Sequence, residues 1–453
     1  MKQWGAQMLH KSLFILVHTL KYRDFMECYK FVKKNEYESY ENLKRYQEEK
    51  LQRLIQFSYD KVPYYHKLFK SLNLKPENIR SIEDLQKLPI LTKEIIRDNQ
   101  KDFVPLNLKD QKYVVRTTGG STGVPLQYRL SMQNGALAFD ILYANWGYAG
   151  YELGDKVAVI AGSSLIPSTK SKIIGSIKEY MVNFKEYSSF DLSEKYMDNI
   201  IIRLSKFKPK YLKGFPSSMY LFAKHIKNRD LKIDFQPEAV FTTAEVLFNS
   251  QRELIEGVFN CEVFDQYGLN DGGVTAFECG MHKGLHIDMI RSIMEIVDEN
   301  GNQLGSDKEG EILATSLHNY AMPFIRYDTH DLGIVSDKKC TCGRELPLLK
   351  KIVGRTTDIL EFPDNMVVSG AAVVDMFKYF SDKIREYQVV QKEQNVVLIR
   401  IVKDTAYSKN DSELIIKAFQ GHVGTNIEIN IEFVDHIETT KAGKWKFIVR
   451  EMG

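Results

Sequence analysis

Residues 261–273 read Cys261-Glu262-Val263-Phe264-Asp265-Gln266-Tyr267-Gly268-Leu269-Asn270-Asp271-Gly272-Gly273. The short apolar run at the start is typical of a buried strand, and the glycines that follow are typical of a loop. Ligands of α/β sheets bind outside the carboxyl ends of the strands. Asp271 is therefore a candidate Mg²⁺ ligand, and Tyr267 is a candidate flat surface for a base. An ordinary glycine-rich turn is the alternative interpretation.

Similar apolar runs occur upstream of this segment, separated by longer helical stretches. Residues 157–161 and 239–241 are short and apolar, whereas residues 192–207 and 217–228 have the length and pattern of helices. Strands that alternate with helices are typical of a mostly parallel sheet covered by helices. The middle of the chain is therefore predicted to have an α/β fold.

The regions on either side of this core have a different character. The first hundred residues are predicted to be largely helical, with helix ends at Val62-Pro63 and Leu88-Pro89, because the residue before a proline avoids the helical conformation. Beyond residue 285, frequent turn signals indicate short antiparallel strands. Near the C-terminus, alternating runs at 396–402 and 427–434 flank helical stretches at 371–381 and 411–421.

These patterns predict an α/β protein with two domains. The large N-terminal domain has helix-covered, mostly parallel sheets and a small antiparallel subdomain, and a small, mobile α+β domain follows it. The expected boundaries are residues 1–358 for the N-terminal domain (helical region 1–100, α/β core 112–285, antiparallel β-rich part 286–358) and residues 359–453 for the C-terminal domain.

Composition and charge exclude several classes of protein. A net charge of +3 over 453 residues does not provide the basic surface of a nucleic-acid binder. Five cysteines are too few for a disulfide framework, so a cytoplasmic location is expected.

The apolar run at residues 13–17 is too short to span a bilayer, which takes roughly 20 residues. A helix packed on the body, or on a partner subunit in a homodimer, is expected there, and peripheral membrane contact is the alternative.

A second candidate site is the loop Arg116-Thr117-Thr118-Gly119-Gly120-Ser121-Thr122-Gly123-Val124-Pro125. Glycine allows close approach of the backbone, and backbone amides and hydroxyls suit the oxygens of a polyphosphate. The loop lacks the Gly-Lys-Ser/Thr sequence of a Walker A motif. If this loop is considered without the other motifs, a flexible linker is the alternative interpretation.

Three more motifs follow, and the five together carry a resemblance. They are Arg326-Tyr327-Asp328-Thr329-His330-Asp331-Leu332-Gly333, Gly354-Arg355-Thr356-Thr357-Asp358 and Lys441-Ala442-Gly443-Lys444. In order and spacing, the set resembles the adenylate-forming superfamily of acyl- and aryl-CoA ligases over nearly the whole chain. It is most similar to the phenylacetate–CoA ligase branch, which includes proteins associated with capsular polysaccharide synthesis.

The resemblance implies a role for each motif around one ATP. The loop made of Thr117, Thr118, Gly119, Gly120, Ser121, Thr122 and Gly123 would bind the phosphates, and Thr243, Ala244 and Glu245 would line the adenine pocket. In the segment with Gln266, Gly268 and Asn270, Tyr267 would pack on the adenine, and Asp271 takes the place of the usual metal-binding glutamate. Asp331 would bind the ribose, with Arg355 beside it. Asp358 would be the domain hinge, and Lys444 would contact the carboxylate and the α-phosphate.

The chemistry of such an enzyme needs these groups. Attack of a carboxylate on the α-phosphorus brings two anions together, so positive charge from Mg²⁺ and Lys444 is required, whereas a protein nucleophile is not. A lysine on a small mobile domain implies one orientation for adenylation and another for acyl transfer. The sequence departs from the family pattern at Asn270, at the shorter Asp271, and at His330, where glycine is usual.

Cysteine and histidine residues near the third and fourth motifs form a candidate metal site. Cys340 and Cys342 are spaced Cys-x-Cys, and Cys279 and His286 lie upstream. With similar positions in the resembling branch, these four residues are predicted to hold a structural Zn²⁺ that pins the antiparallel region. Buried cysteines without a metal are the alternative.

The predicted function is ATP-dependent activation of a small-molecule carboxylic acid to an acyl-adenylate, with release of pyrophosphate and acyl transfer to CoA. One alternative transfers the acyl group to an amine or hydroxyl acceptor in surface polysaccharide biosynthesis. Another is a nucleotide-binding scaffold without catalysis. The acid pocket is expected between residues 212–216, the strand ends near Thr243 and the glycines after Asp271.

Overall fold

The fold is described from a computed structural model. It covers residues 2–118, 126–161, 179–189, 192–355, 359–363, 366–369, 373, 376–377, 380, 383–423, 426–438 and 446–451. Within these ranges, every helix is too short or too polar to cross a membrane.

The N-terminal third consists mainly of helices that pack on the β-rich part of the protein. They are α1 (Lys2–Lys21), α2 (Phe25–Lys34), α3 (Tyr40–Lys61), α4 (Pro63–Ser71), α5 (Lys93–Asp98) and α6 (Met132–Trp146). The Ser39 hydroxyl caps the start of α3 by accepting a bond from the Asn42 amide at 3.4 Å. As predicted, α3 ends before Pro63, which occupies the first position of α4, where its missing N–H costs nothing.

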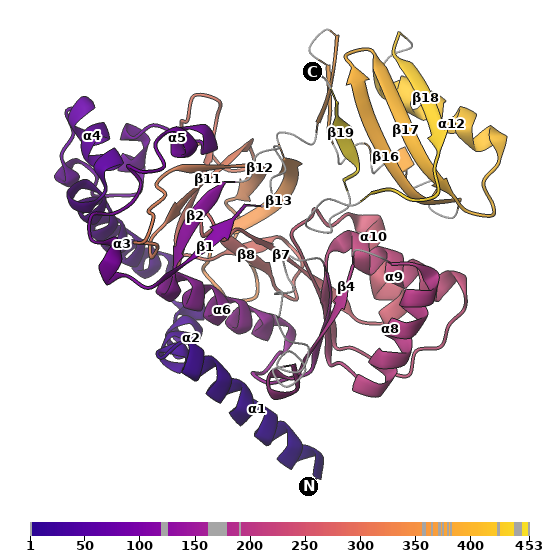
Figure 1. The fold of residues 1–453 in the computed structure, drawn as a ribbon, viewed down its shortest axis with the longest axis horizontal. Coiled ribbons are helices and arrows are strands. Elements are labelled where there is room, and N and C mark those ends of the chain that lie inside the picture. Colours follow the sequence, from indigo (N-terminus) through magenta and orange to yellow (C-terminus); the bar gives the residue numbers. More distant parts are fainter. Residues whose placement is uncertain are drawn as a thin grey trace.

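A single large sheet forms the body of the protein (Figure 1). Among the described residues it has eleven strands in the order β10-β11-β12-β13-β9-β8-β7-β6-β5-β3-β4. Strands β4, β3, β5, β6 and β7 run parallel to one another, and the neighbouring pairs from β7 to β10 are antiparallel. The strands are β3 (Val157–Ala161), β4 (Phe184–Ser188), β5 (Tyr211–Gly214), β6 (Ala239–Thr243), β7 (Glu262–Gly268), β8 (Thr275–Glu278), β9 (Leu285–Ile287), β10 (Ser292–Val297), β11 (Glu309–Ser316), β12 (Tyr327–Ser336) and β13 (Leu348–Arg355).

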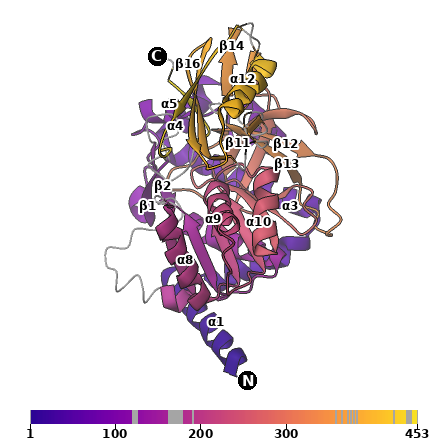
Figure 2. The same ribbon diagram turned by 90° about the vertical axis from the view of Figure 1, so that its right-hand side faces the viewer.

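Helices cover both faces of the parallel part, which confirms the predicted fold class. In β3, Ala158 and Ile160 pack with residues of α8 (Glu194–Phe207), α9 (Pro216–Asn228) and α10 (Asn249–Phe259). Figure 2 shows these three helices side by side. The alternate residues Val157 and Val159 face the other way, toward Trp146 of α6 and Phe14 of α1. Successive side chains of a strand point to opposite faces, so these strands are apolar throughout.

Three smaller sheets complete the described structure. A hairpin of β1 (Tyr113–Thr117) and β2 (Gln127–Ser131) flanks the large sheet, and β14 (Ile359–Phe362) pairs with β15 (Met366–Ser369). The C-terminal sheet has the order β18-β17-β16-β19 and packs on α12 (Lys409–Val423). Its strands are β16 (Ile384–Glu393), β17 (Val396–Lys403), β18 (Glu428–Phe433) and β19 (Ile448–Arg450).

The C-terminal sheet contacts the body through α9 and the start of α10 (Figure 1). The buried Lys224 of α9 donates a hydrogen bond of 2.6 Å to the Ile384 carbonyl at the start of β16. Phe248, which precedes α10, meets Phe447 edge-on, with ring centroids 5.9 Å apart. These contacts place the C-terminal residues beside the carboxyl-terminal side of the parallel strands.

Candidate functional site

The loop after β7 is held against β12 by a hydrogen bond and by close packing. The Tyr327 hydroxyl donates to Asp271 Oδ2 at 2.8 Å. A Cβ atom at Gly272 would lie 2.5 Å from the Cβ of Ala314 and 3.3 Å from the Tyr327 ring, so only glycine fits. The sequence 270–273 thus brings the candidate Mg²⁺ ligand to the middle of the large sheet.

Two predicted site residues from separate motifs lie in direct contact. The hydroxyl of Tyr267, at the end of β7, donates to Asp331 Oδ2 in β12 at 2.9 Å. Burial raises the pKa of Tyr267 well above its usual range, and the Asp331 carboxylate raises it further, so the phenol remains a donor. The backbone of Arg355 is next to them, because Arg355 is the register partner of Asp331 between β13 and β12.

Left-handed backbone occurs at the predicted site residue Ala244 and at His330, where the sequence departs from the family pattern. His330 has φ +59° and Ala244 has φ +71°, values that L-residues rarely adopt and that often mark functional sites. The conformation of His330 explains why glycine is usual there. The Asp328 carboxylate holds it by accepting from the His330 amide at 2.7 Å and pairing with its ring Nδ1 at 2.8 Å.

The β1–β2 hairpin holds Thr117 and ends beside Thr118, the described residues of the predicted phosphate loop, and its Tyr128 lies near Asp271. Thr118 closes the base of the loop, because its amide donates to the Leu126 carbonyl and its hydroxyl accepts from the Leu126 amide, each at 2.9 Å. Burial raises the pKa of Tyr128 in β2, and the nearby charge of Asp271 raises it further. Thr117 pairs with Gln127 at the same end of the hairpin. The predicted residues Gly119, Gly120, Ser121, Thr122 and Gly123, like Asp358 and Lys444, lie outside the described residues.

The predicted adenine segment lies at the carboxyl ends of β6 and β7. Thr243 and Gln266 are register partners in these strands. Gln266 Nε2 is buried and has no hydrogen-bond partner in the described part of the chain. Glu245 Oε2 accepts from the Ser217 amide at the start of α9, at 3.0 Å. This bond joins the adenine segment to the segment predicted to border the acid. Gly268, the last residue of β7, and Asn270, in the loop that follows it, are both exposed.

Arg291 contacts the loop after β7, and the sequence analysis did not identify it as a site residue. Its buried guanidinium donates to the Leu269 carbonyl at 3.4 Å and to Asn134 Oδ1 of α6 at 3.1 Å. Burial lowers the pKa of Arg291 to about 10, so it keeps its positive charge at neutral pH, close to Asp271. No motif marks this residue, because its importance comes from the long-range contact.

Lys213 was also not identified as a functional charge, although residues 212–216 were predicted to border the acid pocket. It is the penultimate residue of β5, which neighbours β3 in the sheet. The strand that follows β3 in the chain, β4, pairs with the other edge of β3. Such a switch point is where ligands bind in open α/β sheets. The side chain is 8% exposed, and its ammonium lies 4.7 Å from the centre of the Trp146 ring. Burial lowers the pKa of Lys213 to about 8.

This buried amine predicts a pH-dependent stability. Below pH 8 both the folded and unfolded chains carry the proton, and folding bears the full cost of burying the charge. Between pH 8 and the usual lysine pKa of 10.5 the folded chain loses the proton first, so its stability rises. Lys213→Met is therefore expected to raise the free energy of unfolding at pH 7 by roughly 3 kcal/mol, a gain that disappears above about pH 10. Urea unfolding at several pH values measures this, with the exposed Lys206→Met as control. A gain that is independent of pH would contradict the assignment.

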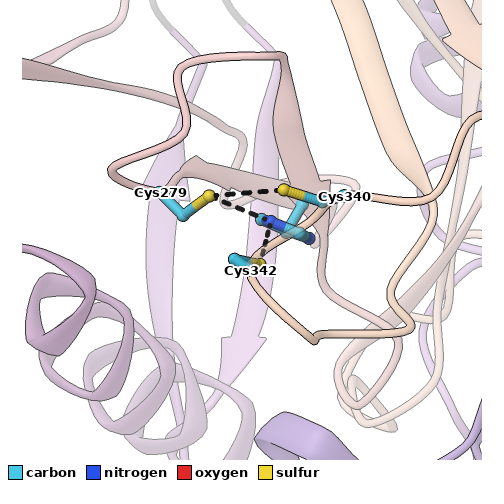
Figure 3. A group of neighbouring side chains, drawn as sticks. Cys279, Cys340 and Cys342 are labelled. Atoms are coloured by element: carbon cyan, nitrogen blue, oxygen red, sulfur yellow. Dashed lines mark hydrogen bonds between the residues drawn. The ribbon is translucent and has the colours of Figure 1, made fainter.

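Three cysteines and a histidine converge in the antiparallel part of the sheet (Figure 3). The donor atoms of Cys279, His286, Cys340 and Cys342 all lie within 4.8 Å of one another. Cys279 Sγ is 3.7 Å from Cys340 Sγ and 3.4 Å from His286 Nε2, which is 3.3 Å from Cys342 Sγ. Around a tetrahedral Zn²⁺ with bonds near 2.0–2.3 Å, neighbouring donors are about 3.5–3.8 Å apart. The predicted four residues thus come together with dimensions that fit this ion.

Both the sequence and the fold of this chain resemble those of known proteins. The family described as "CapK C-terminal domain" matches residues 360–451. The chain is 24% identical to Protein CapK of Staphylococcus aureus over 393 residues, which cover 86% of this chain and 85% of that protein. It is 25% identical to phenylacetate-coenzyme A ligase of Thermus thermophilus over 325 residues, covering 71% and 72% of the two chains.

The fold has solved counterparts. The crystal structure of 2-hydroxyisobutyryl-CoA ligase in the postadenylation state, in complex with R3-HIB-AMP, superposes with a TM-score of 0.75 and 18% identity. The match covers 92% of this chain and 91% of that one. The sequence and fold comparisons agree on one group of proteins. The chain is therefore a homologue of CapK and of the phenylacetate-coenzyme A ligases, and it has the fold of adenylate-forming CoA ligases.

Proposed function

We propose that this protein uses ATP to activate a carboxylic acid as an acyl-adenylate and then transfers the acyl group to an acceptor, with CoA as the first choice. The observation that carries this proposal is the contact between Tyr267 and Asp331. These residues come from motifs far apart in the chain, and their side chains meet at 2.9 Å. A residue that packs on adenine and one that binds ribose need to be neighbours, since base and sugar are joined.

Further groups around this contact support a nucleotide site. The buried Nε2 of Gln266 has no hydrogen-bond partner among the described side chains and backbone. An unpaired buried donor costs about 1–3 kcal/mol, which a ligand acceptor would recover. In our proposal Thr243, Ala244 and Glu245 border the adenine beside Gln266, and Gly268 and Asn270 lie along its edge. Asp331, next to Arg355, accepts hydrogen bonds from the ribose hydroxyls.

The phosphates would lie between the β1–β2 hairpin and the loop after β7. In the proposed complex the loop from Thr117 to Gly123 donates to the β- and γ-phosphates. Asp271 would hold Mg²⁺, which supplies positive charge to the phosphate oxygens. Its Oδ2 is already oriented by Tyr327, and the fixed cation Arg291 lies close by. Lys444 would bind the acid carboxylate and the α-phosphate, where two anions must approach.

The cysteine–histidine cluster is proposed to hold a structural Zn²⁺. The cluster joins the turn after β8 to the segment before β13, which are distant in sequence. Four protein donors close the coordination shell, as in structural zinc sites, whereas catalytic sites keep a position open. The ion would therefore stabilise the sheet next to the nucleotide site and take no part in the reaction.

Purified protein with ATP, Mg²⁺ and a panel of carboxylic acids tests the proposal. We expect at least one acid to drive exchange of labelled pyrophosphate into ATP, because adenylation is reversible. AMP release that requires CoA identifies an acid–CoA ligase, and AMP release that requires an amine or a sugar hydroxyl identifies the other acceptor class. ATP binding without exchange for any acid in the panel would instead support a nucleotide-binding scaffold.

A further inference from the structure

Helix α1 carries a row of leucines on the face turned away from the body. Phe14 is fully buried, and His18, one turn later, stacks on it and bonds to Tyr143 of α6. Leu9, Leu16 and Leu20 are 55%, 49% and 78% exposed. With 3.6 residues per turn, these leucines and Leu13 fall within an arc of about 60°, roughly opposite Phe14. Figure 1 shows α1 extending from one end of the molecule, with the N-terminus at its tip.

The charged residues of this segment have one sign. Residues 1–23 contain Lys2, Lys11, Lys21 and Arg23 and no aspartate or glutamate. Lys11 is exposed and forms one ion pair, with Glu152 at 3.2 Å, and Lys21 lies over the rings of Tyr22 and Phe139. The helix is about 10 Å wide, which is roughly one Debye length at physiological salt. These cations are therefore close enough to attract an anionic surface that covers the leucines.

Either a second copy of α1 or a lipid surface could cover the leucine row. The length of the row and the charges of the segment favour the lipid surface. A second copy of α1 would form a coiled coil, but the leucines extend over fewer than two heptads, whereas a stable coiled coil needs about three or four. Two such helices would also bring together only positive charges. A lipid surface with anionic headgroups satisfies both the apolar row and the charge.

We propose that α1 is an interfacial anchor that lies flat on an anionic bilayer, with Leu9, Leu13, Leu16 and Leu20 inserted among the lipids. The geometry fits this placement, since Phe14 of α1 packs on the body, whereas from Leu9 onward Leu9, Leu16 and Leu20 are exposed and Leu13 is partly exposed. The proposal is independent of the enzymatic function, because none of these residues belongs to the proposed nucleotide site.

Sedimentation of the full-length protein with vesicles tests the anchor. We expect binding to vesicles of phosphatidylcholine with 30% phosphatidylglycerol to be at least about tenfold tighter than to pure phosphatidylcholine, and to weaken in 0.5 M NaCl. The triple variant Leu9→Gln, Leu16→Gln, Leu20→Gln should bind at least about tenfold more weakly. The matched control is Leu72→Gln, Leu106→Gln, Leu414→Gln, which changes exposed leucines elsewhere and should bind like wild type.

A second variant tests the role of the positive charges while the leucines stay unchanged. Lys11→Gln with Lys21→Gln leaves the leucines intact and should lower binding to the anionic vesicles several-fold without changing binding to neutral ones. Equal binding of wild type to both vesicle types, or unchanged binding of the leucine variant, would overturn the anchor. A wild-type dimer that the leucine variant converts to a monomer, without vesicle binding, would identify a second copy as the occupant and also overturn it.

Discussion

Lys444→Ala is expected to abolish acid-dependent exchange of pyrophosphate into ATP, a loss of about 10³-fold or more. In the proposed reaction, a carboxylate attacks a phosphorus that carries negative oxygens, and Lys444 supplies the positive charge between them. Removing one preorganised donor of this kind costs about 10²–10³-fold in other enzymes, and the loss of a full charge should cost at least as much. ATP binding should change little, because the adenine and ribose contacts are made by the body of the protein.

Lys441→Ala is the matched control for this experiment. It removes a lysine three positions away on the same segment and should keep exchange within a few-fold of wild type. Exchange rates and ATP affinity, measured by isothermal calorimetry, separate a catalytic loss from a binding loss. Undiminished exchange in Lys444→Ala would refute the role of this lysine. A proportional loss of ATP affinity would show that it acts in binding alone.

Loss of Cys340, a ligand of the proposed zinc ion, is expected to cause the largest change in stability. A native state that binds an ion at about a thousand times its Kd gains about 4 kcal/mol over the unfolded chain. Cys340→Ser should therefore lose the metal and lower the free energy of unfolding by an amount of this order. Metal analysis by mass spectrometry is expected to find one zinc per wild-type chain and less than a tenth of that in the variant.

Cys261→Ser is the control for the zinc experiment, because Cys261 is partly buried and lies outside the cluster. It should retain zinc. A chelator is expected to lower the melting temperature of wild type and of Cys261→Ser, and to leave that of Cys340→Ser unchanged. A wild-type protein that contains no zinc after expression in zinc-supplemented medium would argue for unligated cysteines.

The elements of the fold could be predicted because their patterns are local. The apolar runs at 157–161 and 239–241 coincide with β3 and β6, and the helical stretch at 217–228 coincides with α9. Each follows from the side-chain period of a strand or helix, which the sequence carries directly. The predicted antiparallel strands are present, and the structure adds that β8 to β13 continue the parallel sheet through the pairing of β7 with β8.

The candidate site was predictable only in part, for a related reason. Tyr267 and Asp271 could be named from the sequence because a glycine-rich loop follows an apolar strand there, and Asp331 was named through the family resemblance of its motif. Arg291 lies outside every motif, and Tyr327 lies in the third motif without a predicted role. Each acts on the loop after β7 through contacts with residues that are far away in sequence, and only packing creates these contacts.

The sequence by itself therefore determined the order of strands and helices, the motif residues and the four metal-binding candidates. Only the tertiary structure decided that Tyr267 touches Asp331, that four donors converge within 4.8 Å, that Lys213 is buried on Trp146 and that the leucines of α1 face outward. The physical reason is that backbone period and turn chemistry are properties of neighbouring residues. Burial, charge environment and side-chain contact depend on which distant segments the folded chain brings together.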